Sequence, residues 1–406
     1  MMRARTRPLG HDVDLNGVAR GDGLLFVRDG VGLAGRGVAA RVPVDDVVGV
    51  LAAIEHDDAL GGAVPGAGPV AVGCLPFLPG APCELVIPRV TVGKGPGGER
   101  WVTVVDGEEG DDFAPVDVDV ELAAPAAPRP RADAFTIHPG VAVPTYLAAV
   151  AAARDAVRDG ELTKAVIARD VFVETGVPLD VHGILLRLRA SFGSSYRYSV
   201  GGFLGASPEL LVERRGDVLR SHPLAGTAPR TGDPTNDART AAALIASMKD
   251  QVEHRVVIDA VYDALLPYCS YLDWEEEPSI VQVANVQHLG TAMEGRLSRP
   301  APSVLELARL LSPTPALGGH PRQAALALIA SVEGFERGRY GGAVGWVDAA
   351  GNGTWAVAIR CAELSPDRRT ARLFAGGGIV AASDPDAELA ETQAKLQAML
   401  SAIVRA

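Results

Sequence analysis

The sequence predicts an α+β fold built on antiparallel β-sheets. Its 406 residues are 48% hydrophobic and 22% charged, which is typical of a globular protein with ample core. Strand-like segments follow one another without the regular alternation of strand and helix that marks a doubly wound parallel sheet. Glycine turns separate several of these segments, as expected of antiparallel neighbours with short connections.

Charge and cysteine content exclude several classes of protein. The net charge of −12 argues against a nucleic-acid partner, which requires a basic surface. An acidic chain that binds an acidic ligand needs a local cluster of lysine and arginine or a bound metal ion. The cysteines lack metal-ligand and redox spacing, so we expect buried free thiols in a reducing compartment at Cys74, Cys83, Cys269 and Cys361.

The N-terminal region shows no targeting signal. Residues 1–10 are basic but lead into no apolar stretch, so they do not form a signal peptide, and we expect them to be frayed. The uncharged run over residues 60–83 is long enough for a membrane span, but its five prolines and six glycines argue against a regular helix. We predict a loop that ends in a buried strand at Val70–Leu75, in a cytoplasmic protein with no membrane partner.

The first part of the chain, residues 11–122, is predicted to be rich in β-structure. A short helix is expected at 44–54, and further strands are expected at Leu24–Arg28, 37–42, 85–87, 90–92 and 101–105. Residues 123–133 are rich in proline and alanine and are interpreted as a surface linker. We expect this linker to be an excursion within one domain that spans residues 11–406, not a boundary between two domains.

The remaining part, residues 134–406, contains the residue types that can support chemistry. Apolar residues at helical spacing predict helices at 144–159, 180–192, 236–265, 302–311 and 320–332. Apolar runs predict strands at 162–174, 280–286, 288–297, 342–348, 354–364 and 371–375, and two strands within 196–212.

The C-terminal stretch 373–396 joins a short apolar strand and three glycines, 376–378, to a helix that begins at Ser383 or Asp384. Glu388, Glu391 and Lys395 fall at i, i+3 and i+7 and therefore share one helix face. A glycine-lined strand end facing such a helix can hold a small anion together with a divalent cation. The alternative is a solvated helix with an ordinary i,i+4 pair between Glu391 and Lys395.

Three further charged residues are candidates for chemistry. Lys164 lies among apolar residues of a strand, where burial lowers the pKa of a lysine and makes it a candidate base; the alternative is a strand end in solvent. Glu209 lies at the rim of an apolar strand, where it is a candidate acid of raised pKa or a plain turn residue. Glu253 lies in the helical segment KDQVEH with His254, which we interpret as an ordinary partner of a neighbouring carboxylate, and a charged helix face is the alternative for this patch.

Several uncharged or loop segments are harder to explain by packing alone. The segment HPLAGTAPR places Gly226 and Thr227 where backbone can approach a ligand closely, and His288 is predicted within a strand. The loop SPTPALGGHPR, residues 312–322, is rich in proline and glycine. Arg360 is predicted inside an apolar strand, where it needs an anionic partner.

Ten motifs in this order and spacing resemble the chorismate-utilising enzymes, the family of the menaquinone, siderophore and tryptophan pathways. They run from about residue 144 to the C-terminus and read TKAVIAR, GASPELLV, PLAGTAPR, KDQVEHRVV, VQHLGTAMEG, SPTPALGGHPR, YGGAVGW, WAVAIRCAEL, FAGGGIV and AELAETQAKL. Within that family the pattern is most similar to isochorismate synthases. The resemblance implies a single α+β unit in which antiparallel sheets pack as a sandwich, with helices outside and the active site in a cleft between sheet and helices.

The resemblance also implies the reaction, the reversible conversion of chorismate to isochorismate with Mg²⁺ as cofactor. Lys164 is implied to be the base that activates water for attack at C2, and Glu209 the acid that protonates the departing C4 hydroxyl. The carboxylates implied to bind the metal ion are Glu253 and Glu391, with Glu388 near it. The residues implied to contact the substrate are Gly226, Thr227, His288, Ala316, Leu317, Arg360, Gly376 and Lys395.

Elementary chemistry agrees with this assignment. Hydroxide is a poor leaving group, so the displacement benefits from an acid and a base on opposite sides of the ring. A clamp of Mg²⁺, arginine and lysine suits a dicarboxylate and explains how an acidic protein can bind it.

Three alternatives to this assignment were weighed. An anthranilate synthase, which uses ammonia and a glutaminase partner, lacks a lysine at the position of Lys164, so we expect no glutaminase subunit. We also expect the protein to be a monomer. A salicylate synthase, which retains the lysine and then eliminates pyruvate, stays open. A non-catalytic chorismate-binding homologue also stays open, although the joint presence of Lys164, Glu209, Glu253 and Glu391 counts against it.

Overall fold

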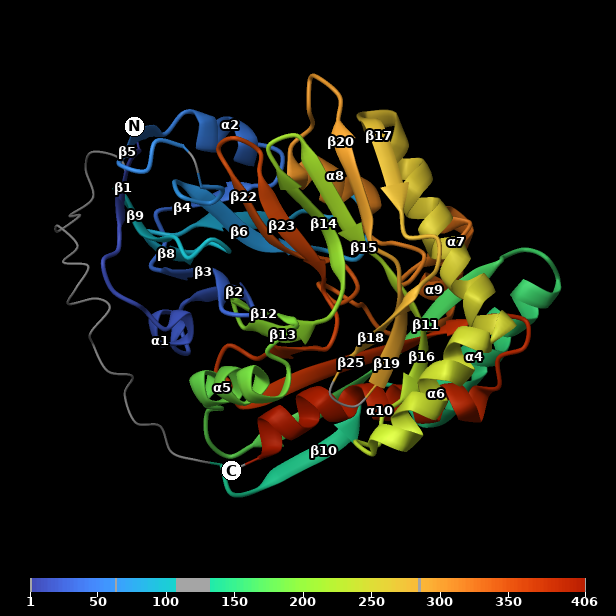
Figure 1. Cartoon of the computed structure of the whole chain (residues 1–406). Coiled ribbons are helices and arrows are strands. Elements are labelled where there is room, and N and C mark those ends of the chain that lie inside the picture. The colour runs from blue at the N-terminus through green and yellow to red at the C-terminus, as the bar shows by residue number, and fades with distance from the viewer. Residues whose placement is uncertain (1, 63, 107–131, 284–285, 406) are drawn as a thin grey trace.

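The computed structural model describes residues 2–62, 64–106, 132–283 and 286–405. Two large sheets and one small sheet form the centre of the molecule, and helices α4, α6, α7 and α10 gather on one side of it, around the ends of β11, β16 and β19 (Figure 1). The helices are α1 (Leu15–Ala19), α2 (Val47–Ala52), α4 (Val143–Arg158), α5 (Val181–Ser191), α6 (Pro234–Ala246), α7 (Met248–Leu265), α8 (Val304–Leu311), α9 (Arg322–Val332) and α10 (Pro385–Val404).

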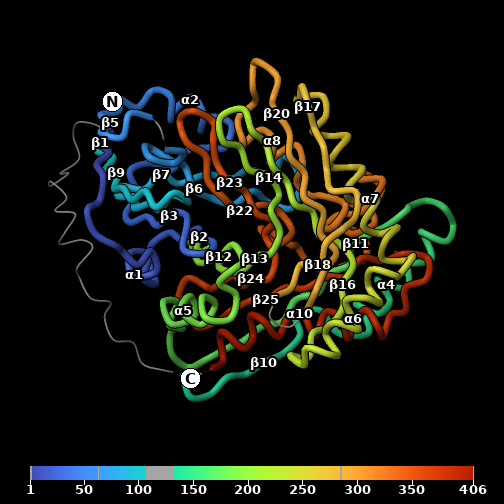
Figure 2. Tube along the Cα trace, in the orientation of Figure 1, coloured from blue at the N-terminus to red at the C-terminus, as the bar shows by residue number. Residues whose placement is uncertain are grey.

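The largest sheet has 13 strands and contains segments from both ends of the chain. In spatial order it comprises β10 (Phe135–Pro139), β11 (Lys164–Thr175), β25 (Thr370–Ile379), β24 (Cys361–Leu364), β13 (Phe203–Ser207), β12 (Tyr196–Val200), β2 (Leu24–Arg28), β3 (Val31–Arg36), β8 (Val90–Lys94), β9 (Arg100–Asp106), β1 (Arg3–Pro8) and β5 (Glu55–Asp58), while β21 (Gly319–His320) pairs with β11. Strands β11 and β25, about 200 residues apart in the sequence, run side by side (Figure 2). Their register places Ala168 opposite Gly376.

The second sheet has nine strands and the third has three. The nine are, in spatial order, β17 (Cys269–Trp274), β20 (Met293–Leu297), β15 (Val218–His222), β14 (Leu210–Arg215), β23 (Gly353–Val357), β22 (Ala343–Asp348), β6 (Val70–Leu75), β7 (Glu84–Ile87) and β4 (Ala40–Pro43). The three are β16 (Leu224–Pro229), β19 (Val286–Gly290) and β18 (Ser279–Gln282). Among the strand pairs described, β1 and β5 are parallel and the others are antiparallel.

The two large sheets pack face to face, which confirms the predicted sandwich. Phe203 of the first sheet lies in one core cluster with Val72 and Trp346 of the second sheet. The next residue, Leu204, points to the opposite face of its strand, where it packs in a cluster with Met399 of α10. Alternation along each strand therefore separates a core between the sheets from an outer core under the helices, and the predicted α+β class with helices outside is confirmed.

The expectation of a frayed N-terminus was wrong. Strand β1 pairs with β9 and, in parallel, with β5. Small buried residues alternate with exposed arginines along β1: Ala4 and Thr6 are buried, whereas the arginines project outward. Of these arginines, Arg5 pairs with Asp106. This period of two is the signature of a half-buried strand. The predicted linker 123–133 lies outside the described residues, except for residues 132 and 133.

Other predicted elements differ in detail, and the strand predicted over 288–297 is divided between β19 and β20, which belong to different sheets. Residues 196–212 hold parts of three strands, not two, and residues 236–265 form two helices, because Ser247 adopts an extended conformation and caps α7 through Asp250 N–H. The strand predicted over 354–364 is divided into β23 and β24. Among the described helices, none combines the length and the apolar character needed to span a bilayer.

Candidate active site

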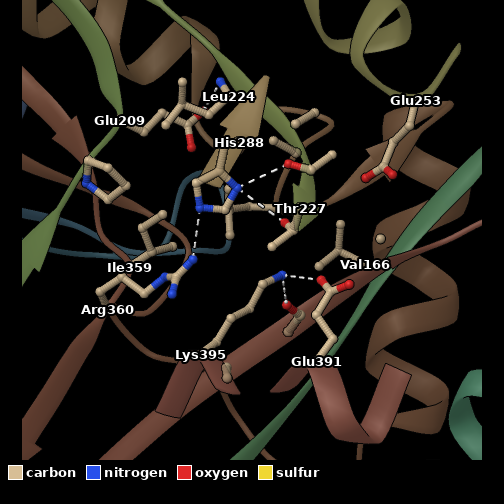
Figure 3. A pocket seen from close by; sticks show the side chains of 18 of the residues that line it. Val166, Glu209, Leu224, Thr227, Glu253, His288, Ile359, Arg360, Glu391 and Lys395 are labelled. Atoms are coloured by element: carbon tan, nitrogen blue, oxygen red, sulfur yellow. Dashed lines mark hydrogen bonds and ion pairs between the residues drawn. The ribbon is translucent and has the colours of Figure 1, made fainter. Parts of the chain in front are cut away.

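A cavity of about 230 Å³ opens where β11 and β25 meet the small sheet and helices α7 and α10. All of the site residues predicted from the sequence line it, namely Lys164, Glu209, Gly226, Thr227, Glu253, His288, Ala316, Leu317, Arg360, Gly376, Glu388, Glu391 and Lys395. Figure 3 shows Glu209 and Glu253 on opposite sides of the view, with Lys395 and Glu391 below them. The fold thus brings together residues that are spread over more than 200 positions of the chain.

The glycines of β25 form a floor against which acidic side chains lie. The sequence predicted that they follow a strand, but they lie within β25. A Cβ at Gly377 would lie 2.6 Å from Glu388 Oε2, and one at Gly378 would collide with Glu253 Oε1. A side chain at either position would therefore displace a carboxylate, and glycine lets these carboxylates lie directly against the strand.

Lys164 begins strand β11 and is 1% exposed. Its ammonium nitrogen lies 2.8 Å from Glu253 Oε1 of α7. The alternative of a strand-end lysine in solvent is therefore wrong. The pair joins the large sheet to the helix across the cavity, and it provides the opposite charge that a buried ammonium requires.

Glu209 precedes β14 and is 3% exposed. Burial raises its pKa to about 8, and the hydrogen bond that Leu224 N–H donates to Oε1 at 3.4 Å opposes this rise only in part. The carboxyl group is therefore mostly protonated at neutral pH. Such a group can donate a proton to a ligand, and the alternative of a plain turn residue does not fit its burial.

Arg360, His288 and Thr227 form a chain of polar contacts along one wall (Figure 3). Arg360 Nη2 donates to His288 Nε2 at 3.0 Å, and His288 Nδ1 lies 3.1 Å from both Thr227 Oγ1 and the carbonyl oxygen of Gly226. Burial and the nearby guanidinium lower the pKa of His288 well below its usual range, so the ring is neutral. The Nδ1–H tautomer, which donates to Gly226, is the one that satisfies both contacts.

The prediction that Arg360 lies inside a strand was wrong, and its anionic partner is not among the protein side chains that it contacts. The residue lies between β23 and β24 with a φ of 52°, in the left-handed region, and its hydrogen-bond partner is the neutral His288. The bend directs the guanidinium into the cavity. Because its partner is neutral, its charge is available to an anionic ligand.

Helix α10 supplies the last group of charges. Asp384 caps it by accepting from Ala387 N–H, as predicted. Lys395 Nζ donates to Gly376 O at 2.8 Å and pairs with Glu391 Oε1 at 2.5 Å. The i,i+4 pair and the site are therefore the same feature, and the alternative of a solvated helix face is wrong.

The two glutamates of α10 differ in their electrostatic surroundings. Burial raises the pKa of Glu388 to about 7, and the adjacent Glu391 adds to the rise. Burial also acts to raise the pKa of Glu391, but the Lys395 ammonium outweighs it and the pKa is lowered overall. Glu391 is therefore ionised at neutral pH, and Glu388 is close to its point of titration.

Sequence reasoning missed several lining residues. Lys249 and Asp250 line the cavity from α7, where they precede Glu253 by four and three residues and share its helix face, so helical spacing alone would have identified them. Tyr340 also lines the cavity, and no spacing indicated it. His254 is buried, and its ring nitrogen Nε2 lies 2.8 Å from Thr291 Oγ1, not beside the carboxylate partner that we expected.

Comparison with known proteins identifies the family. A model of the family described as chorismate binding enzyme matches residues 118–404, more than two thirds of the chain. The chain belongs to the chorismate-binding enzymes. Among curated members, the putative isochorismate synthase MenF of Mycobacterium tuberculosis is 45% identical over 292 residues, which cover 69% of this chain and 78% of the relative. The isochorismate synthase EntC of Escherichia coli is 37% identical over 341 residues, which cover 82% and 81% of the two chains.

Solved structures of the chorismate-binding enzymes share the fold. A putative 2,3-dihydroxybenzoate-specific isochorismate synthase, DhbC of Bacillus anthracis, superposes with a TM-score of 0.79 at 32% identity, covering 96% of this chain and 98% of that chain. MenF of Escherichia coli, the menaquinone-specific isochorismate synthase, gives a TM-score of 0.81 at 22% identity and covers 99% and 95% of the chains, and this likeness speaks for the fold alone.

Proposed function

We propose that this protein is an isochorismate synthase, which interconverts chorismate and isochorismate. In the forward direction water forms a bond to C2 of the ring, the double bonds shift, and the C4 hydroxyl leaves as water after protonation. One proton is lost by the attacking water and one is gained by the leaving hydroxyl, so the reaction needs no redox partner. The sequence relatives named as isochorismate synthases support this choice within the family.

The observation that carries the proposal is that Lys164 and Glu209 line the same cavity. Lys164 lies on the 13-stranded sheet and Glu209 at the start of a strand of the nine-stranded sheet, so they approach the cavity from different layers. We assign Lys164, acting as the neutral amine, as the base that takes the proton from water, and Glu209 as the acid that protonates the leaving hydroxyl. A pKa of about 8 suits Glu209 to this role at neutral pH.

The substrate carries two carboxylates, and the cavity offers them cationic and backbone groups. We assign Arg360, Lys395 and the backbone of Gly376 to the enolpyruvyl carboxylate. Gly226, Thr227 and His288 form the polar wall beside the ring, and Ala316 and Leu317 form its apolar wall. The enolpyruvyl carboxylate and the ring thus contact different groups, and this fixes the orientation of the ring.

A magnesium ion fits the acidic side of this cavity. The glycine floor leaves room where a Cβ would otherwise lie, and Glu388 Oε2 and Glu391 Oε1 are 2.6 and 3.9 Å from that same point above Gly377. The described residues contain no group of three or more His, Cys, Asp or Glu side chains arranged to hold a metal ion, and Mg²⁺ commonly binds through one or two carboxylates and several waters. We assign Glu253 and Glu391 as ligands, with Glu388 beside them, and the ion would neutralise the ring carboxylate of the substrate.

The direct test is incubation of the purified protein with chorismate and Mg²⁺, followed by chromatographic analysis of the products. The proposal expects isochorismate in equilibrium with chorismate, approached from either side. Salicylate together with pyruvate would instead identify a salicylate synthase, and anthranilate formed with added ammonia would identify an anthranilate synthase. Binding of chorismate without turnover would identify a non-catalytic homologue.

A further inference from the structure

Lysine is rare in this chain, and its positions are informative. The sequence contains four lysines among 38 basic residues, and arginine supplies the rest. Three of the four, Lys164, Lys249 and Lys395, line the cavity. The fourth, Lys94, pairs with Asp12 elsewhere on the molecule. A chain that uses arginine almost everywhere thus places ammonium groups around one site, and Lys249 is the one with no role in the proposed reaction.

Lys249 differs from the other two in its depth. Its side chain is 46% exposed, whereas those of Lys164 and Lys395 are 2% and 14% exposed. It stands in the first turn of α7, four residues before Glu253 and on the same helix face. Lys249 therefore marks the rim of the cavity, and the other two lysines mark its interior.

The interior lysines are held tightly, but Lys249 is not. Lys164 and Lys395 lie 2.8 and 2.5 Å from their carboxylate partners. Lys249 Nζ lies 4.0 Å from Glu388 Oε1, which belongs to α10 on the other side of the opening. An ammonium group on a flexible four-carbon stem can move between such a distant partner and an incoming anion.

The charge of the surroundings makes a rim cation useful. The protein carries a net charge of −12, and four carboxylates line this cavity besides Glu209, namely Asp250, Glu253, Glu388 and Glu391. A dicarboxylate that approaches from solvent meets this negative field before it reaches the buried cations. A positive charge at the rim offsets that repulsion over about a Debye length, which is close to 10 Å at 0.1 M salt.

We propose that Lys249 captures the dianionic substrate at the mouth of the cavity and acts in association rather than in the chemical step. This inference rests on the proposed function, because it takes chorismate as the ligand. Lys249 then binds the substrate carboxylates during entry. The two interior lysines act on the bound substrate, Lys164 as base and Lys395 as a carboxylate partner.

The test compares Lys249→Gln with Lys249→Arg and with Arg255→Gln as the matched control. Arg255 lies on the same helix and is exposed, but it pairs with Asp259 and lies over the ring of Trp274. Its replacement by glutamine removes one positive charge, as Lys249→Gln does. At about 0.01 M salt, Lys249→Gln is expected to lower kcat/KM about tenfold while kcat stays within about twofold. At about 1 M salt the difference closes. Lys249→Arg keeps the salt dependence of the unaltered protein, and Arg255→Gln keeps both its kcat/KM and its salt dependence.

Several results would overturn the inference. One is a kcat/KM of Lys249→Gln at low salt that equals that of the unaltered protein, and another is a decrease of kcat alone. The others are a decrease of kcat/KM that is the same at both salt concentrations, and an equal decrease of kcat/KM in Arg255→Gln. A lowered Tm with an unchanged salt dependence would show a structural role instead. Calorimetric binding of chorismate at the two salt concentrations repeats the comparison without turnover. Binding without conversion would therefore reject the proposed function and still decide the role of Lys249.

Discussion

Lys164 and Glu209 are both withdrawn from water, and each is held by one polar contact. Lys164 pairs with Glu253, and Glu209 accepts a long hydrogen bond from Leu224 N–H. The buried Lys164 ammonium depends strongly on its single partner, whereas the Glu209 carboxyl group is mostly protonated at neutral pH. Substitution of Lys164 therefore tests chemistry and charge balance together, and each variant needs a measurement of binding and stability besides activity.

Lys164→Met is expected to lower kcat by about 10²- to 10⁴-fold, because it removes the proposed base and retains most of the apolar stem. Chorismate affinity, measured by calorimetry, should stay within about tenfold of the unaltered value, since the carboxylate partners Arg360 and Lys395 remain. Lys94→Met, which removes a lysine that pairs with Asp12 outside this cavity, is the control and should leave kcat unchanged. Near-normal turnover by Lys164→Met would rule out its role as base.

The raised pKa of Glu209 predicts a falling limb in the pH profile. As a proton donor it must be protonated, so kcat should decline as pH rises above about 8. Glu209→Gln should be nearly inactive and lack this limb, whereas Glu294→Gln, at an exposed position on β20, should retain it. A Glu209→Gln enzyme that kept both its rate and the limb would exclude this assignment.

The same group should also make stability depend on pH. Its pKa is 4.5 in the unfolded chain and about 8 in the folded protein, so the folded state holds the extra proton between these values. Stability contributed by this proton is therefore lost as pH rises through that window. Thermal unfolding should show a weaker decline of Tm with pH in Glu209→Gln than in the unaltered protein.

At the scale of elements, the part of the β11 edge that pairs with no strand is completed by buried side chains. Between the short pairing with β21 and the pairing with β10, Glu333 Oε1 accepts from Ala168 N–H at 2.7 Å and Arg337 Nη2 donates to Val166 O at 2.7 Å. Arg337 Nη1 also donates to Leu317 O at 2.7 Å. The buried pair of Glu333 and Arg337 thus replaces a strand and fixes the loop that lines the cavity.

Removal of one member of this pair should be more harmful than removal of both. Arg337→Met leaves the Glu333 carboxylate buried without a cation, which costs about 3–5 kcal/mol of unfolding free energy. The double variant Glu333→Met/Arg337→Met should recover part of that loss, because two buried charges disappear together. Chemical denaturation measures both effects, and a double variant less stable than Arg337→Met would contradict this account.

The glycine floor of β25 gives a second prediction at this scale. An added methyl group in Gly378→Ala would collide with Glu253 and Lys164, so the ion pair must move. A displacement of about 1 Å in a catalytic pair costs about 10²-fold in kcat. Gly176→Ala, where the added Cβ meets no atom within 4 Å, is the matched control and should be fully active. Circular dichroism checks that Gly378→Ala is folded, and steady-state kinetics measures its kcat. A folded Gly378→Ala variant with normal kcat would contradict the prediction.

At the scale of the whole molecule, the cavity forms where three sheets and two helices meet, and each carboxylate assigned to the metal ion already has a lysine partner. Lys164 pairs with Glu253 and Lys395 pairs with Glu391. Removal of Mg²⁺ by EDTA should therefore abolish turnover while the protein stays folded, with a Tm lower than that of the Mg²⁺-loaded protein. Mg²⁺ added back should raise Tm through binding to the folded state, and Glu391→Gln should shift that response to higher Mg²⁺ concentration. Full activity after exhaustive chelation would remove the metal from the proposal.

Many elements of the fold could be predicted from local pattern. Strands β2 and β6 were predicted to the residue, because each is an apolar run bounded by turn residues. The alternation in β1 was visible in the same way but was obscured by its arginines. The breaks at Ser247 and Arg360 were not predicted, because a helix cap and a left-handed residue depend on what the neighbouring chain contacts.

The sequence by itself determined which residue types could act, namely a lysine in an apolar strand, a glutamate beside another, and acidic and basic residues at helical spacing on α10. Its motif order determined the family. Only the tertiary structure decided that β11 and β25 lie together and that Glu253 meets Lys164 above Gly378. It also revealed Lys249 at the rim and the neutral partner of Arg360. The reason is physical: spacing fixes which side chains share a strand or helix face, whereas distance, burial and therefore pKa depend on segments that meet only when the sheets pack.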